Sequence, residues 1–107
     1  MSLSQLELEQ DCINSIENDN IERIKQLLSN VFGINSFLRS RHKLWDTNCF
    51  SILAAASFYG SRSIVDYLIE KNVQINQVDS LKNRTALHWA VCSGNFKITK
   101  ILIESGI

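Results

Sequence analysis

The sequence predicts an all-α fold in which helix-turn-helix units stack side by side as a solenoid and are joined by β-hairpin-like loops. Two observations predict this fold. One segment of the chain recurs 34 residues later, and apolar side chains recur at helical spacing within each copy. A chain of 107 residues with 45% apolar composition is long enough to bury a core. We therefore expect residues 1–107 to form a single domain.

The first unit is expected at about residues 5–35 and begins with a helix from Leu6 to Glu17. This helix mixes apolar and acidic residues, as expected for a terminal unit with one packed face and one solvent-exposed face. Asp19 and Asn20 then offer N-cap oxygens to a second helix. The apolar residues of that helix fall on one face: Ile21, Ile24, Leu27 and Leu28.

A long loop, residues 36–45, follows the first unit and carries a local cluster of cations. The cations that we single out are Arg39, Arg41 and Lys43, and apolar residues flank them. Two interpretations stay open. The segment is either a short extra helix packed by its apolar residues, or a docking site for an acidic partner.

The second unit is expected at about 46–78 and the third at about 79–107. Each begins with a helix rich in small residues, "ILAAASFY" or "ALHWAVCS", which lets neighbouring helices approach closely. Gly60 and Gly94 then end these helices, as glycines in the left-handed conformation do. A second helix with apolar residues at helical spacing follows in each unit. The aligned identities are Leu53 with Leu87, Ala56 with Ala90, Gly60 with Gly94, Ile64 with Ile98, and residues 68–70 with 102–104.

The stretch "TALHWA" resembles the T-P-L-H-x-A signature of ankyrin repeats, and the resemblance covers about residues 12 to 107. The terminal glycine, the leucine of the second helix and the pair "IN" recur in order beside it. The chain departs from the signature because it has no proline. In the middle unit Ser51 and Ala54 also stand where threonine and histidine are usual. The resemblance implies a non-enzymatic repeat array that binds other proteins.

His88 lies inside an apolar run, and three roles compete for it. A metal ligand would need further His, Cys, Asp or Glu partners, and only Cys92 is near in sequence. A general base would need a nucleophile, for which Thr85 is the candidate. The favoured role is structural. By resemblance, a buried His88 bonds Thr85 and holds a turn to a helix.

The resemblance also implies which side chains would meet a partner. The hairpin tips would present Thr47, Asn48 and Phe50, and then Leu81, Lys82 and Arg84. The exposed ends of the first helices would present Phe58 and Tyr59, and then Cys92 and Ser93. Phe58 and Tyr59 interest us most because aromatic side chains are frequent anchors at interfaces.

Composition argues against several other classes of protein. The 11 basic residues balance 11 acidic ones, so no charge excess indicates nucleic acid. No apolar run is long enough to cross a bilayer. Three widely spaced cysteines favour neither a disulfide framework nor a metal clip, which indicates the cytoplasm, with the nucleus as an alternative. We expect no metal and no cofactor.

The C-terminal stretch "NFKITKILIESGI" is more apolar than a terminal repeat requires. We therefore expect this end to receive further repeats or to self-associate. Two functions remain. The chain is either a scaffold or adaptor that binds a protein partner, or the N-terminal regulatory or targeting segment of a larger enzyme, channel or effector.

Overall fold

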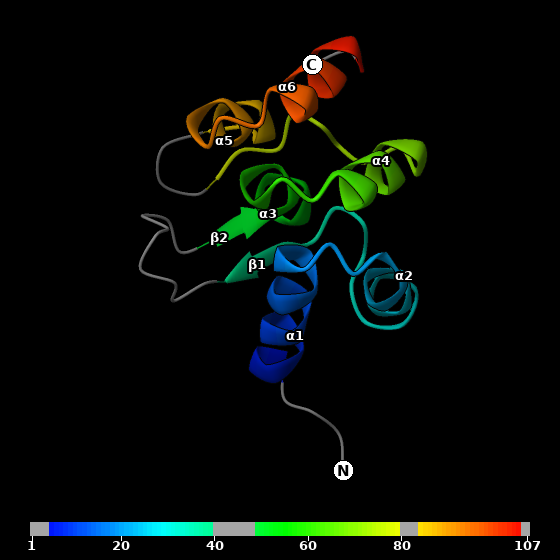
Figure 1. Cartoon of the computed structure of the whole chain (residues 1–107). Helices are drawn as coiled ribbons and strands as arrows, with labels where there is room; N and C mark the ends of the chain where they lie inside the picture. The colour runs from blue at the N-terminus through cyan, green and yellow to red at the C-terminus, as the bar shows by residue number, and fades with distance from the viewer. Residues whose placement is uncertain (1–4, 40–48, 80–83, 106–107) are drawn as a thin grey trace.

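A computed structural model of the protein describes residues 5–39, 49–79 and 84–105. Within these residues the elements are α1 (Gln5–Glu17), α2 (Ile21–Asn30), β1 (Phe37–Arg39), β2 (Cys49–Ser51), α3 (Ile52–Tyr59), α4 (Arg62–Glu70), α5 (Ala86–Cys92) and α6 (Phe96–Glu104). The helices follow one another as the pairs α1–α2, α3–α4 and α5–α6 (Figure 1). The expected all-α architecture of successive helical hairpins is confirmed.

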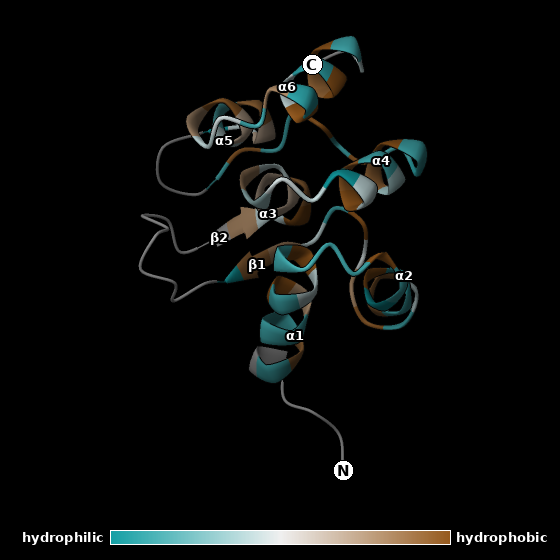
Figure 2. Cartoon of the chain, in the orientation of Figure 1, coloured by the Kyte–Doolittle hydropathy of each residue, from teal (hydrophilic) through white to brown (hydrophobic). Residues whose placement is uncertain are grey.

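The first helix of each pair stacks on the first helix of the next. α3 packs against α1 on one side and α5 on the other, and α2 packs beside α4. Residues 52–57 of α3 are all buried, and Ala54, Ala55 and Ala56 among them keep the helices close. Figure 2 shows the consequence, because α3 is mainly brown to white whereas α1 carries much teal. The core therefore runs along the stack, which measures 42 × 28 × 21 Å.

The turn inside each pair uses a left-handed residue at an equivalent position. Gly60 and Gly94 have φ angles of 73° and 77°, and Asp19, which a shift of 41 residues aligns with Gly60, has a φ of 48°. Glycine adopts this conformation at little cost, whereas aspartate is one of the few other residues that tolerate it. The expected left-handed conformation of both glycines is thus borne out, and Asp19 has the same backbone conformation at the position aligned with Gly60.

Polar side chains at these turns tie each pair to the next. The Ser61 hydroxyl donates to the Ile16 carbonyl, and Asn95 Nδ2, which aligns with Ser61, donates to the Ser57 carbonyl at 2.8 Å. Asp19 accepts from the Ile64 N–H, at the start of α4, at 3.2 Å. Asp19 therefore caps the helix of the following pair, and the expectation that it caps α2 is wrong. Its two carboxylate oxygens accept from the N–H groups of Ser63 and Ile64, in the first turn of α4.

The ends of the first two pairs are also bridged. The Asn35 side-chain oxygen accepts from the Gln74 N–H at 2.7 Å, and Gln77 Nε2 donates to the Asn35 carbonyl at 2.9 Å. The recurring pair "IN" thus marks a contact between successive units.

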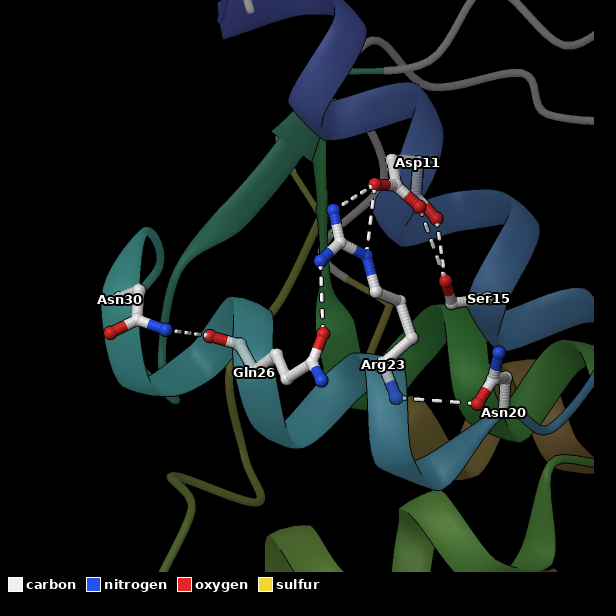
Figure 3. Close-up of polar contacts among 6 residues, drawn as sticks. All are labelled: Asp11, Ser15, Asn20, Arg23, Gln26 and Asn30. Carbon is white, nitrogen blue, oxygen red and sulfur yellow. Dashed lines mark hydrogen bonds and ion pairs between the residues drawn. The ribbon is translucent and has the colours of Figure 1, made fainter. Parts of the chain in front are cut away.

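Within the first pair, Arg23 of α2 reaches Asp11 of α1 (Figure 3). Its Nε donates to the Asp11 carboxylate at 3.0 Å, and a second guanidinium nitrogen bonds the same oxygen. This hydrogen bond raises the pKa of Arg23 above its ordinary value. Asn20 caps α2 as expected, because its side chain accepts from the Arg23 N–H at 3.2 Å.

The loop after the first pair contains a strand. β1 pairs with β2 in antiparallel register, with Phe37 opposite Ser51 and Leu38 opposite Phe50. Residues 37–39 are therefore extended, and the interpretation of this part of the loop as an extra helix is wrong. Leu38 and Phe50 point into the core because alternate residues of a strand face opposite sides.

Candidate partner-binding surface

The first helices and the two strands lie on one side of the stack, and α2 and α4 lie on the other (Figure 1). We define the first-helix face as the side made by α1, α3, α5 and the strands. The residues expected at the first-helix ends lie at, or directly after, the C-terminal ends of α3 and α5.

An aromatic cluster lies on the first-helix face between the second and third pairs. The Phe58 ring stands edge-on to Tyr59 at 5.1 Å between ring centres and edge-on to Trp89 at 5.6 Å. Phe58 and Tyr59 are half-buried, whereas Trp89 is buried. Phe58 thus joins two repeats while part of its surface and part of the Tyr59 surface face solvent. Edge-to-face contacts of this kind hold the rings in fixed orientations.

Arg84 is fixed beside this cluster. Its guanidinium carbon lies 4.2 Å from the centre of the Trp89 ring, and its Nε donates to the Asp79 carboxylate at 2.7 Å. The Asp79 side chain is 1% exposed and the Arg84 side chain 24%. Arg84, which we expected at a hairpin tip, is therefore held against its own repeat and is only partly exposed.

Cys92 and Ser93 are exposed at the end of α5, as expected. The Ser93 hydroxyl donates to the Trp89 carbonyl at 2.9 Å and accepts from Asn95 Nδ2 at 2.8 Å. Ser93 therefore also supports the turn into α6. Cys12 and Cys92 are both free cysteines, but only Cys92 is exposed. Burial raises the pKa of the Cys12 thiol to about 12.

The expectation that Phe50 is exposed at a hairpin tip is wrong, because its ring is 1% exposed. Its strand register turns it toward Leu38 in the core. The other expected tip residues, Thr47, Asn48, Leu81 and Lys82, lie outside the described residues.

The basic loop is described only at Arg39. Its side chain is 67% exposed and bonds the buried Glu9 carboxylate at 3.4 Å. The cation that we assigned to a docking site thus already has an acidic neighbour in α1. Arg41 and Lys43 lie outside the described residues.

Thr85 and His88 contact each other as expected of a structural pair. The Thr85 N–H donates to His88 Nδ1 at 3.0 Å, and the Thr85 hydroxyl lies 3.1 Å from the same nitrogen. His88 Nδ1 therefore acts as the acceptor for the backbone N–H at the start of α5. The imidazole is nevertheless exposed, so the expectation that it is buried is wrong.

The last pair leaves apolar side chains uncovered. Val91 of α5 is 56% exposed and Ile103 of α6 is 57% exposed. Val91 aligns with Ser57, which the third pair buries completely. We call Val91 and Ile103, with the half-buried Leu87, the end face.

Several connecting residues escaped the sequence analysis. Asn95, Ser61 and the acceptor role of Asp19 depend on partners 37 to 45 residues away. The sequence did carry a signal for Asn95 and Ser61. A shift of 34 residues aligns them, and each is a polar residue that directly follows a turn glycine. A second missed group is Lys25, Tyr67 and Lys71, which meet across α2 and α4.

Across residues 5–39, 49–79 and 84–105, no helix has the length and apolar character needed to span a bilayer. In the same residues, no three His, Cys, Asp or Glu side chains gather as a metal site would require. His88 therefore has no cluster of ligand-forming side chains around it in the described structure.

A family profile described as ankyrin repeats, three copies, matches residues 12–107. The chain is also similar to a palmitoyltransferase, AKR1, of Lachancea kluyveri, with 36% identity over 72 residues. That alignment spans 67% of this chain and 10% of the yeast protein. A second relative is the E3 ubiquitin-protein ligase Ufd4 of Drosophila melanogaster, with 35% identity over 66 residues, 57% of this chain and 2% of the fly protein. The chain thus spans a small fraction of either relative.

Proposed function

Because the chain belongs to the ankyrin repeat family, whose repeats are protein-interaction modules, we propose that it binds a partner protein through its first-helix face. The observation that carries the proposal is the partly exposed pair Phe58 and Tyr59, in which the Phe58 ring contacts both Tyr59 and the buried Trp89. Rigid aromatic side chains at the centre of a surface supply much of the binding free energy of an interface.

The neighbours of this pair fit a partner-binding role. Cys92 and Ser93 extend the surface along α5 with small exposed side chains. Arg84 adds a partly exposed cation beside Trp89, already held in place by Asp79. A pre-ordered surface loses less conformational entropy on binding, which favours affinity.

Affinity capture with matched variants tests the proposal. The bait is the intact chain, and quantitative mass spectrometry compares the captured proteins. We expect the double variant Phe58→Ala, Tyr59→Ala to lose its specific partners by tenfold or more, about 1.4 kcal/mol. The control Glu22→Ala, Gln26→Ala removes exposed side chains from α2. Equal capture by wild type and the Phe58, Tyr59 variant, with unchanged circular dichroism, would refute the proposal.

A second candidate is a regulatory or targeting role within a larger enzyme, channel or effector. Both relatives are described as enzymes, and this chain matches only a small part of each. On this hypothesis the chemistry belongs to other parts of such a protein, and these 107 residues do not catalyse a reaction themselves. The full reading frame distinguishes the two: a catalytic domain or membrane spans would favour this candidate, and repeats alone would favour the first.

The end face supports a further proposal of stacking, either by additional repeats or by self-association in the cytoplasm. Exposed apolar patches attract partners because their burial releases water. Analytical ultracentrifugation of the wild-type chain and of the Val91→Glu variant measures the molecular mass as a function of protein concentration. A concentration-dependent mass that the substitution abolishes supports self-association, whereas identical monomers at high concentration exclude it.

A further inference from the structure

An arrangement of two cations and one aromatic ring lies on α2 and α4, away from the first-helix face. The Lys25 ammonium is 5.5 Å from the centre of the Tyr67 ring, and the Lys71 ammonium is 5.8 Å from the same centre. α2 packs beside α4 (Figure 1). Lys25 approaches the Tyr67 ring from α2, and Lys71 approaches it from the residue that follows α4. Both lysines are exposed, and Tyr67 is half-buried.

Neither lysine has a carboxylate within ion-pair distance in the described part of the chain. Nearby helical cations do have one, since Arg62 reaches Asp66 at 4.0 Å and Lys100 reaches Glu104 at 3.9 Å. The face of a tyrosine ring attracts a cation only weakly at an exposed site. Two like charges therefore converge on one ring that compensates them only in part.

We propose that Lys25, Tyr67 and Lys71 form a docking point for an acidic segment of a partner protein. Carboxylates of an acidic segment beside the ring would accept charge-assisted hydrogen bonds from the ammonium groups. It would also relieve the repulsion between the two cations. The tyrosine adds a rigid apolar surface and a hydroxyl, which are features of interface anchors. We call these three residues the lysine clamp.

The surroundings of the lysine clamp favour a short acidic peptide over a nucleic acid. Exposed carboxylates lie on the same two helices, at Glu22 of α2 and at Asp66 and Glu70 of α4. A duplex needs several phosphate contacts along its backbone, and these carboxylates would repel it. A peptide can place one or two acidic residues at the clamp and neutral or basic residues at the acidic flanks.

The proposal is independent of the first-helix face, and a nuclear magnetic resonance titration of the full chain tests it. The probe is a peptide of four glutamates between glycine-serine flanks, added to the 15N-labelled protein at low salt. We expect amide shifts confined to α2 and α4, with a Kd of about 1 mM. Salt should weaken the binding because it screens exposed charges.

The variants make the assignment specific. Lys25→Glu with Lys71→Glu should abolish the shifts, whereas the matched control Lys97→Glu with Lys100→Glu, on exposed lysines of α6, should leave them unchanged. Tyr67→Phe should retain binding and Tyr67→Ala should weaken it at least threefold.

Three outcomes would overturn the proposal. The first is an absence of shifts at saturating peptide, and the second is an equal loss of binding in the α6 control. The third is tighter binding of a DNA duplex than of the peptide, which would indicate a general attraction for polyanions.

Discussion

At Gly60 and Gly94 the backbone takes φ angles of 73° and 77°, which an L-residue adopts only at a cost. The two positions differ in their surroundings. A Cβ on Gly60 would lie 2.9 Å from the side-chain oxygen of Asn95, whereas a Cβ on Gly94 would meet nothing within 4 Å. Asn95 is held there because it donates to the carbonyls of Ser57 and Phe58. Gly60 therefore serves both the turn and the contact between repeats.

Substitution by alanine separates these two roles. Gly94→Ala should lower the free energy of unfolding by about 1–2 kcal/mol, the cost of a left-handed alanine. Gly60→Ala should lower it by roughly 1 kcal/mol more, because Asn95 must move and weaken its hydrogen bonds. Urea denaturation followed by circular dichroism measures both values. Equal losses would mean that Asn95 adjusts without cost.

Single residues were predictable from the sequence where their partners are local. The turn glycines follow from spacing within one repeat, and the contact between Thr85 and His88 was implied by the resemblance to the ankyrin signature. Phe50 was wrongly assigned to the surface. Its orientation depends on pairing with Leu38, and the local sequence does not reveal this pairing. The exposure of His88 likewise depends on packing around its helix.

At the scale of elements, an ion pair holds the start of the third repeat against α5. Asp79 is buried, its N–H donates to the Arg84 carbonyl at 3.0 Å, and its carboxylate accepts from Arg84 Nε. The guanidinium then lies over Trp89. Asp79 and Arg84 are thus held together by a backbone hydrogen bond and an ion pair, and Arg84 is held to α5 by its contact with Trp89.

A double-mutant cycle measures the coupling of this pair. Arg84→Met should destabilise the protein by about 3 kcal/mol, because it leaves the Asp79 carboxylate buried with one cation fewer. Asp79→Asn in the same background should restore part of that loss by removing the charge. Stabilities from thermal and urea unfolding give the coupling energy. Additive losses would show that the pair contributes no specific interaction.

Most elements were predictable because helical periodicity and terminal glycines are strong local signals. Residues 52–59 form a helix with the expected bounds, and α1 begins one residue before the expected position. β1 was not predictable, because a three-residue strand exists only through its pairing with β2. The boundaries of the repeats stay a prediction.

At the scale of the whole molecule, α3 couples the first pair to the last. It packs on α1 and α5, and residues 52–57 are buried on both sides. Repeat arrays gain stability from such nearest-neighbour interfaces more than from isolated units. A chain of three pairs should therefore unfold as one cooperative unit, because α3 couples the first pair to the last.

A substitution far from Trp89 tests this coupling. Ile24 of α2 is fully buried, so Ile24→Ala should cost about 2–5 kcal/mol. In a Trp45→Phe background, Trp89 fluorescence reports the third pair and circular dichroism reports all helices. We expect both urea midpoints to fall together, because loss of the first pair exposes α3 and removes the support of α5. The control Val31→Ala alters an exposed side chain and should shift neither midpoint. An unchanged fluorescence midpoint in Ile24→Ala would show that the last two pairs fold without the first.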